Sequence, residues 1–201
     1  MTLRTEEVAL DWSPESAHPT SHVRSTLLSS SIQTLKDRGH YDRYVTLLPE
    51  EHHEAVIFTL APTWLEIRHG IAHYRACDAL GLPKDELIAI GSAVGNRIQG
   101  TFLGQLAKGA RGVGANPWIP LLRFGGLWGR LLQGGGVRVI KLGPKDARID
   151  LRNSPLHEIP YFRLAFHGIV QAATDVFARK SYTKELPATR DAQIAYSLSW
   201  V

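Results

Sequence analysis

The sequence lacks the features that define several classes of protein. It contains one cysteine, Cys77, so it has neither an intrachain disulfide framework nor a zinc site built on several thiolates. Charged residues or glycines interrupt every apolar run well before the roughly 18 residues that a membrane-spanning helix needs. Residues 1–20 also lack the basic start and the apolar core of a secretory signal. These absences favour a soluble cytoplasmic protein with no transmembrane segment.

The composition is that of a folded globular protein. Hydrophobic residues make up 44% of the 201 residues and charged residues 21%, which argues against disorder of the whole chain. The length suits one domain. Residues 1–24 contain Pro14 and Pro19 among scattered polar residues, and we interpret them as a flexible N-terminal arm. We expect residues 25–201 to form a single domain.

The net charge of +4 is spread unevenly along the chain. Residues 1–60 hold nine acidic and five basic residues, whereas the 49 residues from Arg97 to Lys145 hold eight basic residues and no acidic one. Such an acid-free stretch favours an anionic partner, for example a nucleotide, an acidic lipid head group or an acidic protein face. The alternative is that acids elsewhere in the fold pair with these bases. Without an RGG run or a helix-turn-helix pattern, nucleic acid is not favoured as a partner.

Apolar residues recur at helical spacing over the first two-thirds of the chain and again near its end. The pattern, bounded mostly by glycine or proline, predicts helices over residues 29–38, 41–48, 49–59, 64–80, 83–108, 117–132 and 161–177. The longest carries Gly91, Gly95, Gly100 and Gly104, although glycine destabilises a helix. We expect a second helix to approach its backbone closely there; a ligand lying against the bare backbone is the alternative.

The apolar period changes to two after Gly134-Gly135-Gly136, which indicates β-strands. Alternation predicts four strands near residues 137–142, 146–152, 178–186 and 193–200. They form two hairpins, one on each side of the last helix. Helices are thus segregated from strands, which favours an α+β fold. We predict a helical layer packed on a four-stranded antiparallel sheet, with a strand-strand-helix-strand-strand C-terminal half.

The C-terminal quarter carries one family resemblance. Its matching features run in order through the strand Ala147–Leu151, the segment Asn153-Ser154-Pro155-Leu156, a helix with Tyr161-Phe162, Gly168 and Ala172-Ala173, and two strands that end at Trp200. This order resembles the TRAPP small-subunit fold, which 4-vinyl reductase-type ligand-binding domains share. Ser154 departs from the family pattern, in which asparagine directly precedes Pro-Leu. The ligand-binding relatives imply small-molecule sensing, and the TRAPP relatives imply a helix-mediated dimer and a buried acyl chain attached to a cysteine.

A second resemblance extends over most of residues 29–201. It rests on the segments Ser30–Leu35, Thr63-Trp64-Leu65, His73–Leu82, Gly100–Leu103, Pro117-Trp118 and Gly134–Ala147. These are similar to segments of a large paralogous family of myxobacterial proteins of comparable length. The resemblance to that family implies no particular activity for this chain. It implies one fold for the whole chain and a bacterial cytoplasmic setting.

Two histidines form a candidate metal or haem site. His69 and His73 lie one helical turn apart, so their rings share one face. Two such nitrogens are able to ligate a metal ion, or one of them a haem iron. A zinc site also needs a third ligand, and no HExxH pattern supplies one. The alternative is a pair of structural histidines that are hydrogen-bonded at the edge of the core.

Cys77 follows His73 by one further turn. A nucleophilic cysteine needs contact with a base and a lowered thiol pKa. No third member of a catalytic group is visible beside it, and we expect Cys77 to be a small buried hydrophobic residue. The TRAPP resemblance implies acyl attachment at this cysteine, although no lipidation motif accompanies it.

Large apolar residues indicate where a ligand is held. A helix layer on a sheet with many aromatics can leave an apolar cavity. We expect such a cavity beside Trp64, His73, Trp128 and Phe166. We expect anion-binding groups at its edge from Arg97, Arg111 and Arg123. The predicted ligand-binding set is Trp64, His73, Cys77, Arg97, Trp128 and Phe166.

These features favour a non-enzymatic sensory or regulatory module that binds a small apolar or anionic ligand and self-associates as a homodimer. The sequence identifies no cofactor. One alternative is a protein-interaction scaffold of TRAPP type without a ligand. Another is a haem or metal-binding sensor that uses His69 or His73. An enzyme is not favoured, because no catalytic spacing stands out.

Overall fold

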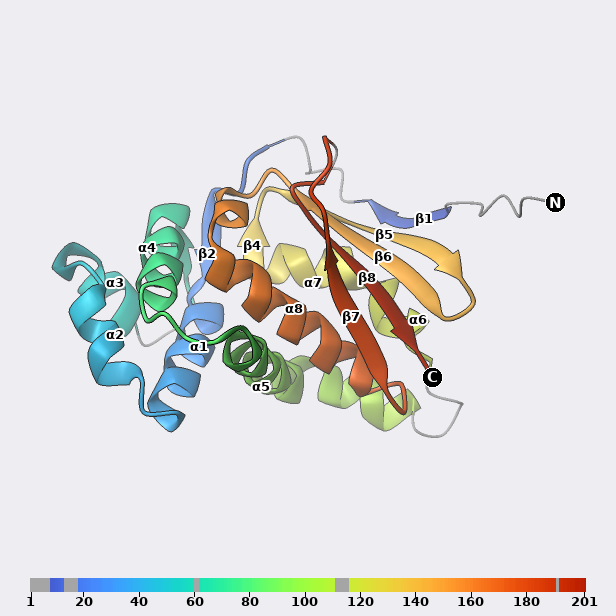
Figure 1. Ribbon diagram of the computed structural model, residues 1–201, viewed down its shortest axis with the longest axis horizontal. Coiled ribbons are helices and arrows are strands. Elements are labelled where there is room, and N and C mark those ends of the chain that lie inside the picture. Colours follow the sequence, from blue (N-terminus) through green and yellow to red (C-terminus); the bar gives the residue numbers. More distant parts are fainter. Residues whose placement is uncertain (1–7, 13–17, 60–61, 111–115, 191) are drawn as a thin grey trace.

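The structure is a computed structural model, which describes residues 8–12, 18–59, 62–110, 116–190 and 192–201. For residues 8–12 and 99–110 it describes the backbone alone. Helices gather on one side of a long twisted sheet (Figure 1). The predicted α+β class is confirmed, with the helical elements α1 (Ser25–Asp37), α2 (Tyr41–Leu47), η2 (Glu50–His52), α3 (His53–Ile57), α4 (Ile67–Asp78), α5 (Lys84–Ala110), α6 (Trp118–Leu121), α7 (Phe124–Leu131), η3 (Pro155–Glu158) and α8 (Pro160–Asp175).

The main sheet contains the four predicted strands in antiparallel array. Its order is β1 (Val8–Trp12), β5 (Gly136–Gly143), β6 (Asp146–Arg152), β8 (Ile194–Trp200) and β7 (Ser181–Leu186). The additional strand β1 pairs with β5 at the edge. It belongs to the segment 1–24 that was predicted as an arm, so the described part of that segment contributes to the sheet. The domain boundary at residue 24 stays a prediction.

A second, three-stranded sheet was missed by the sequence analysis. It has the order β3 (Trp64–Glu66), β2 (His22–Arg24) and β4 (Leu132–Gln133), all antiparallel. Residues 64–66 were predicted to start a helix, and residue 132 to end one. Strands of two or three residues are too short to show an alternating pattern. They form because segments that are distant in the sequence pair with one another. This small sheet joins the start of α1, the start of α4 and the end of α7.

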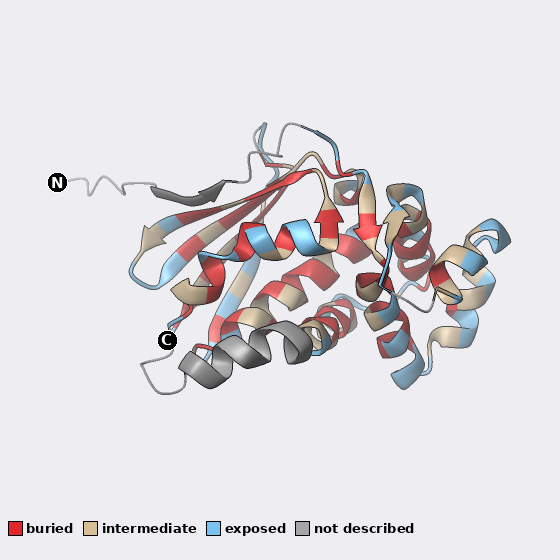
Figure 2. Cartoon of the chain, turned by 180° about the vertical axis from the view of Figure 1, so that it is seen from behind, coloured by how far each residue is buried: buried red, intermediate tan, exposed pale blue. Residues whose placement is uncertain are grey.

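One face of the main sheet packs against helices. Val139, Ile149 and Tyr196 lie side by side on neighbouring strands β5, β6 and β8, and all three are fully buried. The Tyr196 hydroxyl donates a hydrogen bond to the Arg163 carbonyl of α8 (2.7 Å), which fixes that helix to the sheet. α7 packs beside it on β5. Figure 2 shows buried residues along the facing sides of these layers and exposed residues on the outer side of α7.

The close contact expected from the glycines of the long helix is present. A Cβ atom at Gly91 of α5 would lie 1.8 Å from the Ala165 carbonyl oxygen of α8. A Cβ at Gly168 would lie 2.0 Å from the Ile88 carbonyl oxygen. Only glycine fits at either position, and α5 therefore lies directly against α8 within one chain. Gly100 and Gly104 lie outside the residues whose side chains are described.

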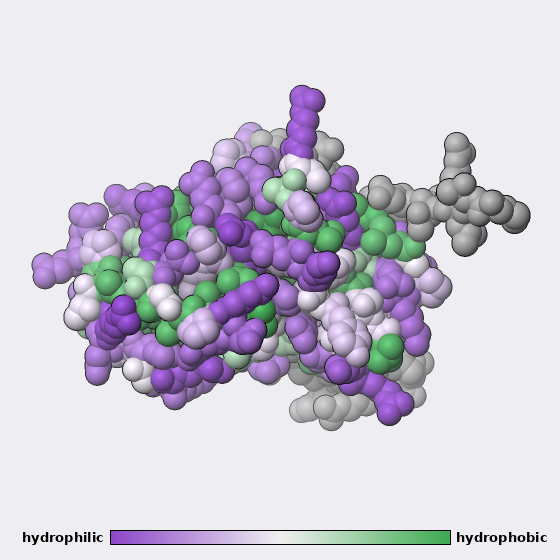
Figure 3. All heavy atoms as spheres, in the orientation of Figure 1, coloured by the Kyte–Doolittle hydropathy of each residue, from purple (hydrophilic) through white to green (hydrophobic). Residues whose placement is uncertain are grey.

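The face seen in Figure 3 is mainly hydrophilic, with smaller hydrophobic patches. No helix in the described part of the chain is long and apolar enough to cross a membrane. The homodimer and the cytoplasmic location stay predictions.

Candidate ligand cavity and arginine-lined groove

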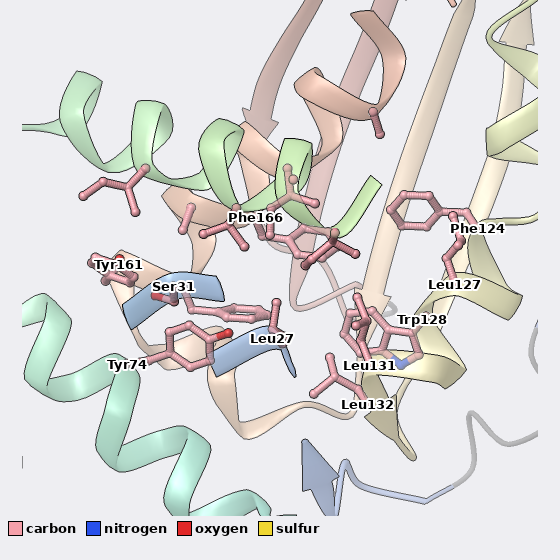
Figure 4. Close-up of a pocket in the computed structure, with 18 residues that line it drawn as sticks. Leu27, Ser31, Tyr74, Phe124, Leu127, Trp128, Leu131, Leu132, Tyr161 and Phe166 are labelled. Atoms are coloured by element: carbon pink, nitrogen blue, oxygen red, sulfur yellow. The ribbon is translucent and has the colours of Figure 1, made fainter. Parts of the chain in front are cut away.

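An apolar cavity of about 80 Å³ lies between α1, α4, α5, α7 and α8. Phe166 occupies the middle of its wall (Figure 4). Its ring stacks on Phe162 at 5.7 Å between centroids and meets Trp128 edge-on at 6.0 Å. These rings form an aromatic part of the wall, and aliphatic side chains such as Leu27 and Val94 line the rest of the cavity. The cavity thus sits between elements that the sheet and the α5–α8 contact hold in place.

Three hydroxyl groups mark one end of the cavity. Ser31, Tyr74 and Tyr161 lie together there, on the side away from Phe124 and Trp128 (Figure 4). The Tyr161 hydroxyl lies beside Ser31 and Cys77 but makes no well-formed hydrogen bond among the described residues. Burial raises the pKa of Tyr74 and Tyr161 well above that of free tyrosine. Both phenols therefore stay neutral, and this end offers hydrogen bonds without charge.

His73 lies behind this end, in a closed hydrogen-bond network. Its Nδ1 is 2.7 Å from the Tyr44 hydroxyl and its Nε2 is 3.0 Å from the Ser31 hydroxyl. Its side chain is completely buried, and this burial lowers its pKa to about 3. A neutral imidazole has one donor and one acceptor nitrogen, and both have partners here. His73 is therefore a satisfied core residue that does not reach the cavity wall.

Cys77 belongs to the same buried network. Its sulfur lies 3.7 Å from Nε2 of His73, and the residue is completely buried. Burial raises the pKa of its thiol above the ordinary value. The thiol therefore stays protonated, which suits the expected small hydrophobic residue and not a nucleophile.

His69 turns toward a different partner from His73. Its Nδ1 lies 3.0 Å from Nδ1 of His52, and Glu51 contacts the other side of that ring at 3.4 Å. Burial and the neighbouring His52 lower the pKa of His69. In the part of the chain that the structure describes, no three histidine, cysteine or carboxylate side chains gather as a metal site.

A groove of about 590 Å³ adjoins the cavity on the solvent side of α1, α5 and α7. It is lined by three arginines, Arg24, Arg97 and Arg130, and by Trp64. The Arg24 guanidinium lies over the Trp64 ring at 4.9 Å, and Arg97 forms an ion pair with Asp37. No described residue that lines the groove is acidic.

The groove and the cavity share three side chains. Ile98, Leu127 and Leu131 line both spaces, and each is partly exposed. They form the partition between the solvent-facing groove and the enclosed cavity. All three are aliphatic, so hydrocarbon side chains separate the two spaces.

The predicted binding residues fall into three places. Trp128 and Phe166 line the cavity, Trp64 and Arg97 line the groove, and His73 and Cys77 lie behind the cavity wall. Arg111 lies outside the described residues, and Arg123 lines neither space. The sequence analysis missed Arg24, which lay in the predicted arm, and Arg130, which the acid-free stretch had included without singling it out.

Comparison with solved structures identifies the fold. The chain is similar to an Fe(II) unliganded H-NOX protein from K. algicida, with a TM-score of 0.64 and 10% identity over 89% of this chain and 96% of that one. An oxygen-binding H-NOX domain related to soluble guanylate cyclases, in its oxygen complex, gives 0.59 and 10% over 88% and 94%. A protein studied for haem redox potential and porphyrin distortion gives 0.57 and 11% over 88% and 99%. No family model and no curated protein matches the sequence.

These neighbours correct both family resemblances. The TRAPP and 4-vinyl reductase assignment is wrong, since H-NOX structures match across nearly the whole chain and not its last quarter alone. The strand-strand-helix-strand-strand order that carried it is short and does not distinguish folds that contain it. No comparison supports the myxobacterial family either. The chain has the fold of H-NOX domains.

Proposed function

We propose that this chain is a non-catalytic sensory module that binds a small molecule in the cavity between α5, α7 and α8. The observation that carries this proposal is an apolar space with an aromatic wall, inside a fold shared with H-NOX proteins. Two of the similar solved structures are of proteins that bind haem or oxygen. Their fold therefore favours a ligand-binding sensor, and the haem alternative above all, over a scaffold without a ligand.

The residues around the cavity do not fit haem. All nine histidines and the single cysteine lie in the described part of the chain, and none of them lines the cavity. The wall offers oxygen only, from Ser31, Tyr74 and Tyr161, and burial keeps both tyrosines protonated. Haem iron is held by histidine, cysteine, methionine or tyrosinate. His69 and His73 therefore do not serve as iron ligands at this cavity, and we propose a ligand without a coordinated metal.

α7 is the wall element best placed to report occupancy of the cavity. It is one short helix of eight residues that contains Gly125, Gly126 and Gly129. The Trp128 indole donates a hydrogen bond to the Gly134 carbonyl just beyond it (3.1 Å). The helix lines the cavity and also contacts β1, β2 and β5. A ligand that displaces α7 would thus move the edges of both sheets.

Native mass spectrometry of the purified chain tests the proposal. We expect excess mass that is lost on denaturation and is absent from Val94→Phe, which fills the cavity. Val94→Leu is a milder variant that retains the fold if phenylalanine disrupts it. Val176→Phe places the same ring at an exposed position on the far end of α8 and serves as the control. Equal mass in all variants, or a bare chain that binds no added ligand, would contradict the proposal.

An absorption spectrum of the same preparations tests the haem alternative. After incubation with hemin, we expect no Soret band that depends on a histidine of this chain. A Soret band that His73→Ala or His69→Ala removes would establish the haem sensor instead.

A further inference from the structure

We infer that the ligand is a single-chain anionic amphiphile, with its alkyl chain in the cavity and its carboxylate in the arginine-lined groove. This inference rests on the proposed function, and it adds the chemical class of the ligand. It follows from two adjoining spaces of opposite character. One is apolar, and the other is more open to solvent and lined by three arginines.

The cavity accepts hydrocarbon and excludes a charged head group. Apart from the three hydroxyls at its far end, its described wall consists of apolar side chains and glycine. An ion buried there would lose its hydration without gaining a counter-charge, which is strongly unfavourable. An apolar cavity of about 150 Å³ in an engineered protein stays dry and binds benzene. The space of about 80 Å³ here thus suits the end of an alkyl chain.

The groove supplies the counter-charge for an anion. Arg24, Arg97 and Arg130 line it from three different elements, and Arg97 forms an ion pair with Asp37. A guanidinium group binds a carboxylate through paired hydrogen bonds, and such charge-assisted bonds are stronger than neutral ones. Arg130 lies within the acid-free stretch of the sequence.

The partition between the two spaces gives the chain its path. Leu127 and Leu131 lie one turn apart on α7, and Ile98 faces them from α5. An alkyl chain that passes between these side chains replaces one set of aliphatic contacts by another. The head group then stays in the groove, where water and arginine both reach it.

Calorimetric titration with octanoate, decanoate and dodecanoate, each below its micelle concentration, tests the inference. We expect affinity to rise about fourfold for each methylene until the cavity is full, which corresponds to about 0.8 kcal/mol per buried methylene. Matched 1-alkanols are expected to bind at least about tenfold more weakly than the acids, because they lack the charge-assisted bonds.

Variants of the groove locate the head group. Arg97→Gln and Arg130→Gln should each weaken dodecanoate about tenfold and leave 1-dodecanol unchanged. Arg43→Gln, at an exposed position on α2 away from the groove, is the matched control and should change neither. Higher salt should weaken the acids and not the alcohols.

Each outcome separates this inference from the proposed function. Equal binding of acids and alkanols, without effect of either arginine variant, would overturn the anionic ligand and leave a purely apolar one in the cavity. Retention of a different molecule by the purified chain, with no binding of these probes, would overturn the inference alone. No binding of any probe by a chain that also retains no mass would overturn both.

Discussion

Two neighbouring regions of the molecule differ in how their interior is filled. Around His73, polar side chains from α1, α2 and α4 are completely buried, and both imidazole nitrogens have hydrogen-bond partners. In the adjacent cavity, apolar side chains from α5, α7 and α8 leave space unfilled. Ser31 belongs to both regions, since its hydroxyl binds His73 and also lines the cavity.

The comparison supports placing the proposed ligand in the cavity and not beside His73. A buried polar group without a partner is unfavourable, so polar networks in a core are closed. An apolar cavity lowers stability as well, and the ligand that we propose would offset that cost by filling it. Of the two regions, the one around His73 has its polar groups satisfied by one another, and the cavity is the candidate site that we propose.

The largest expected effect separates His73, inside the closed hydrogen-bond network, from His167, a buried histidine outside it. His73→Leu leaves the Tyr44 and Ser31 hydroxyls buried without a partner and should lower the free energy of unfolding by about 3 kcal/mol. His167 is also buried, but its Nδ1 makes no hydrogen bond among the described residues. His167→Leu should therefore change stability by less than about 1 kcal/mol. Urea unfolding of both variants measures the difference, and similar losses would refute a special role for the His73 network.

Acid should weaken the His73 region selectively. The pKa of His73 is lowered to about 3 in the folded chain, whereas an unfolded histidine has a pKa near 6.5. The unfolded state thus binds a proton that the native state does not, and stability falls as the pH decreases from about 6.5 toward 3. At pH 5 the loss from this residue is about 2 kcal/mol.

The matched variant for this pH effect is His73→Gln, which lacks the titrating group. The difference between its unfolding curve and that of the natural chain isolates His73, because His69 and His167 are present in both. Parallel pH profiles of the two proteins would show that His73 is already protonated in the folded state or that its pKa is ordinary.

The smallest effect concerns the cavity. Val94→Leu adds one methylene to unfilled space and should stabilise the unliganded chain by about 0.8 kcal/mol. Val23→Leu adds the same group at a fully buried position that packs against Gly70, and overpacking there should destabilise by about 1–3 kcal/mol. Thermal unfolding compares the two variants. Destabilisation by Val94→Leu to the same extent would mean that the cavity has no usable space.

The sequence predicts the fold better than the site, for a physical reason. Helical and alternating periods are local, so seven helical segments and four strands are visible in the sequence. The helix at 64–80 begins late, at Ile67, because Trp64–Glu66 pairs with β2, 40 residues away in the chain. No local pattern records such a pairing.

The site depends on similar long-range contacts. His73 and Cys77 carry groups that often serve as ligands or nucleophiles, so the sequence analysis assigned them to a site. The residues that hydrogen-bond to His73 in the core, Tyr44 and Ser31, lie 29 and 42 residues away in the chain. Trp128 and Phe166 were assigned to a ligand site from their size alone, and the structure places both at the cavity. The sequence predicted only part of the groove, because Arg24 and Arg130 come together through the pairing of strands in the small sheet.

A crystal structure determined under xenon pressure tests the central claim most directly, since xenon enters dry apolar cavities. The account predicts a xenon atom between Val94, Trp128 and Phe166, and none beside His73. Xenon absent from this cavity, or bound next to His73 instead, would contradict the assignment of the ligand site to the space between α5, α7 and α8.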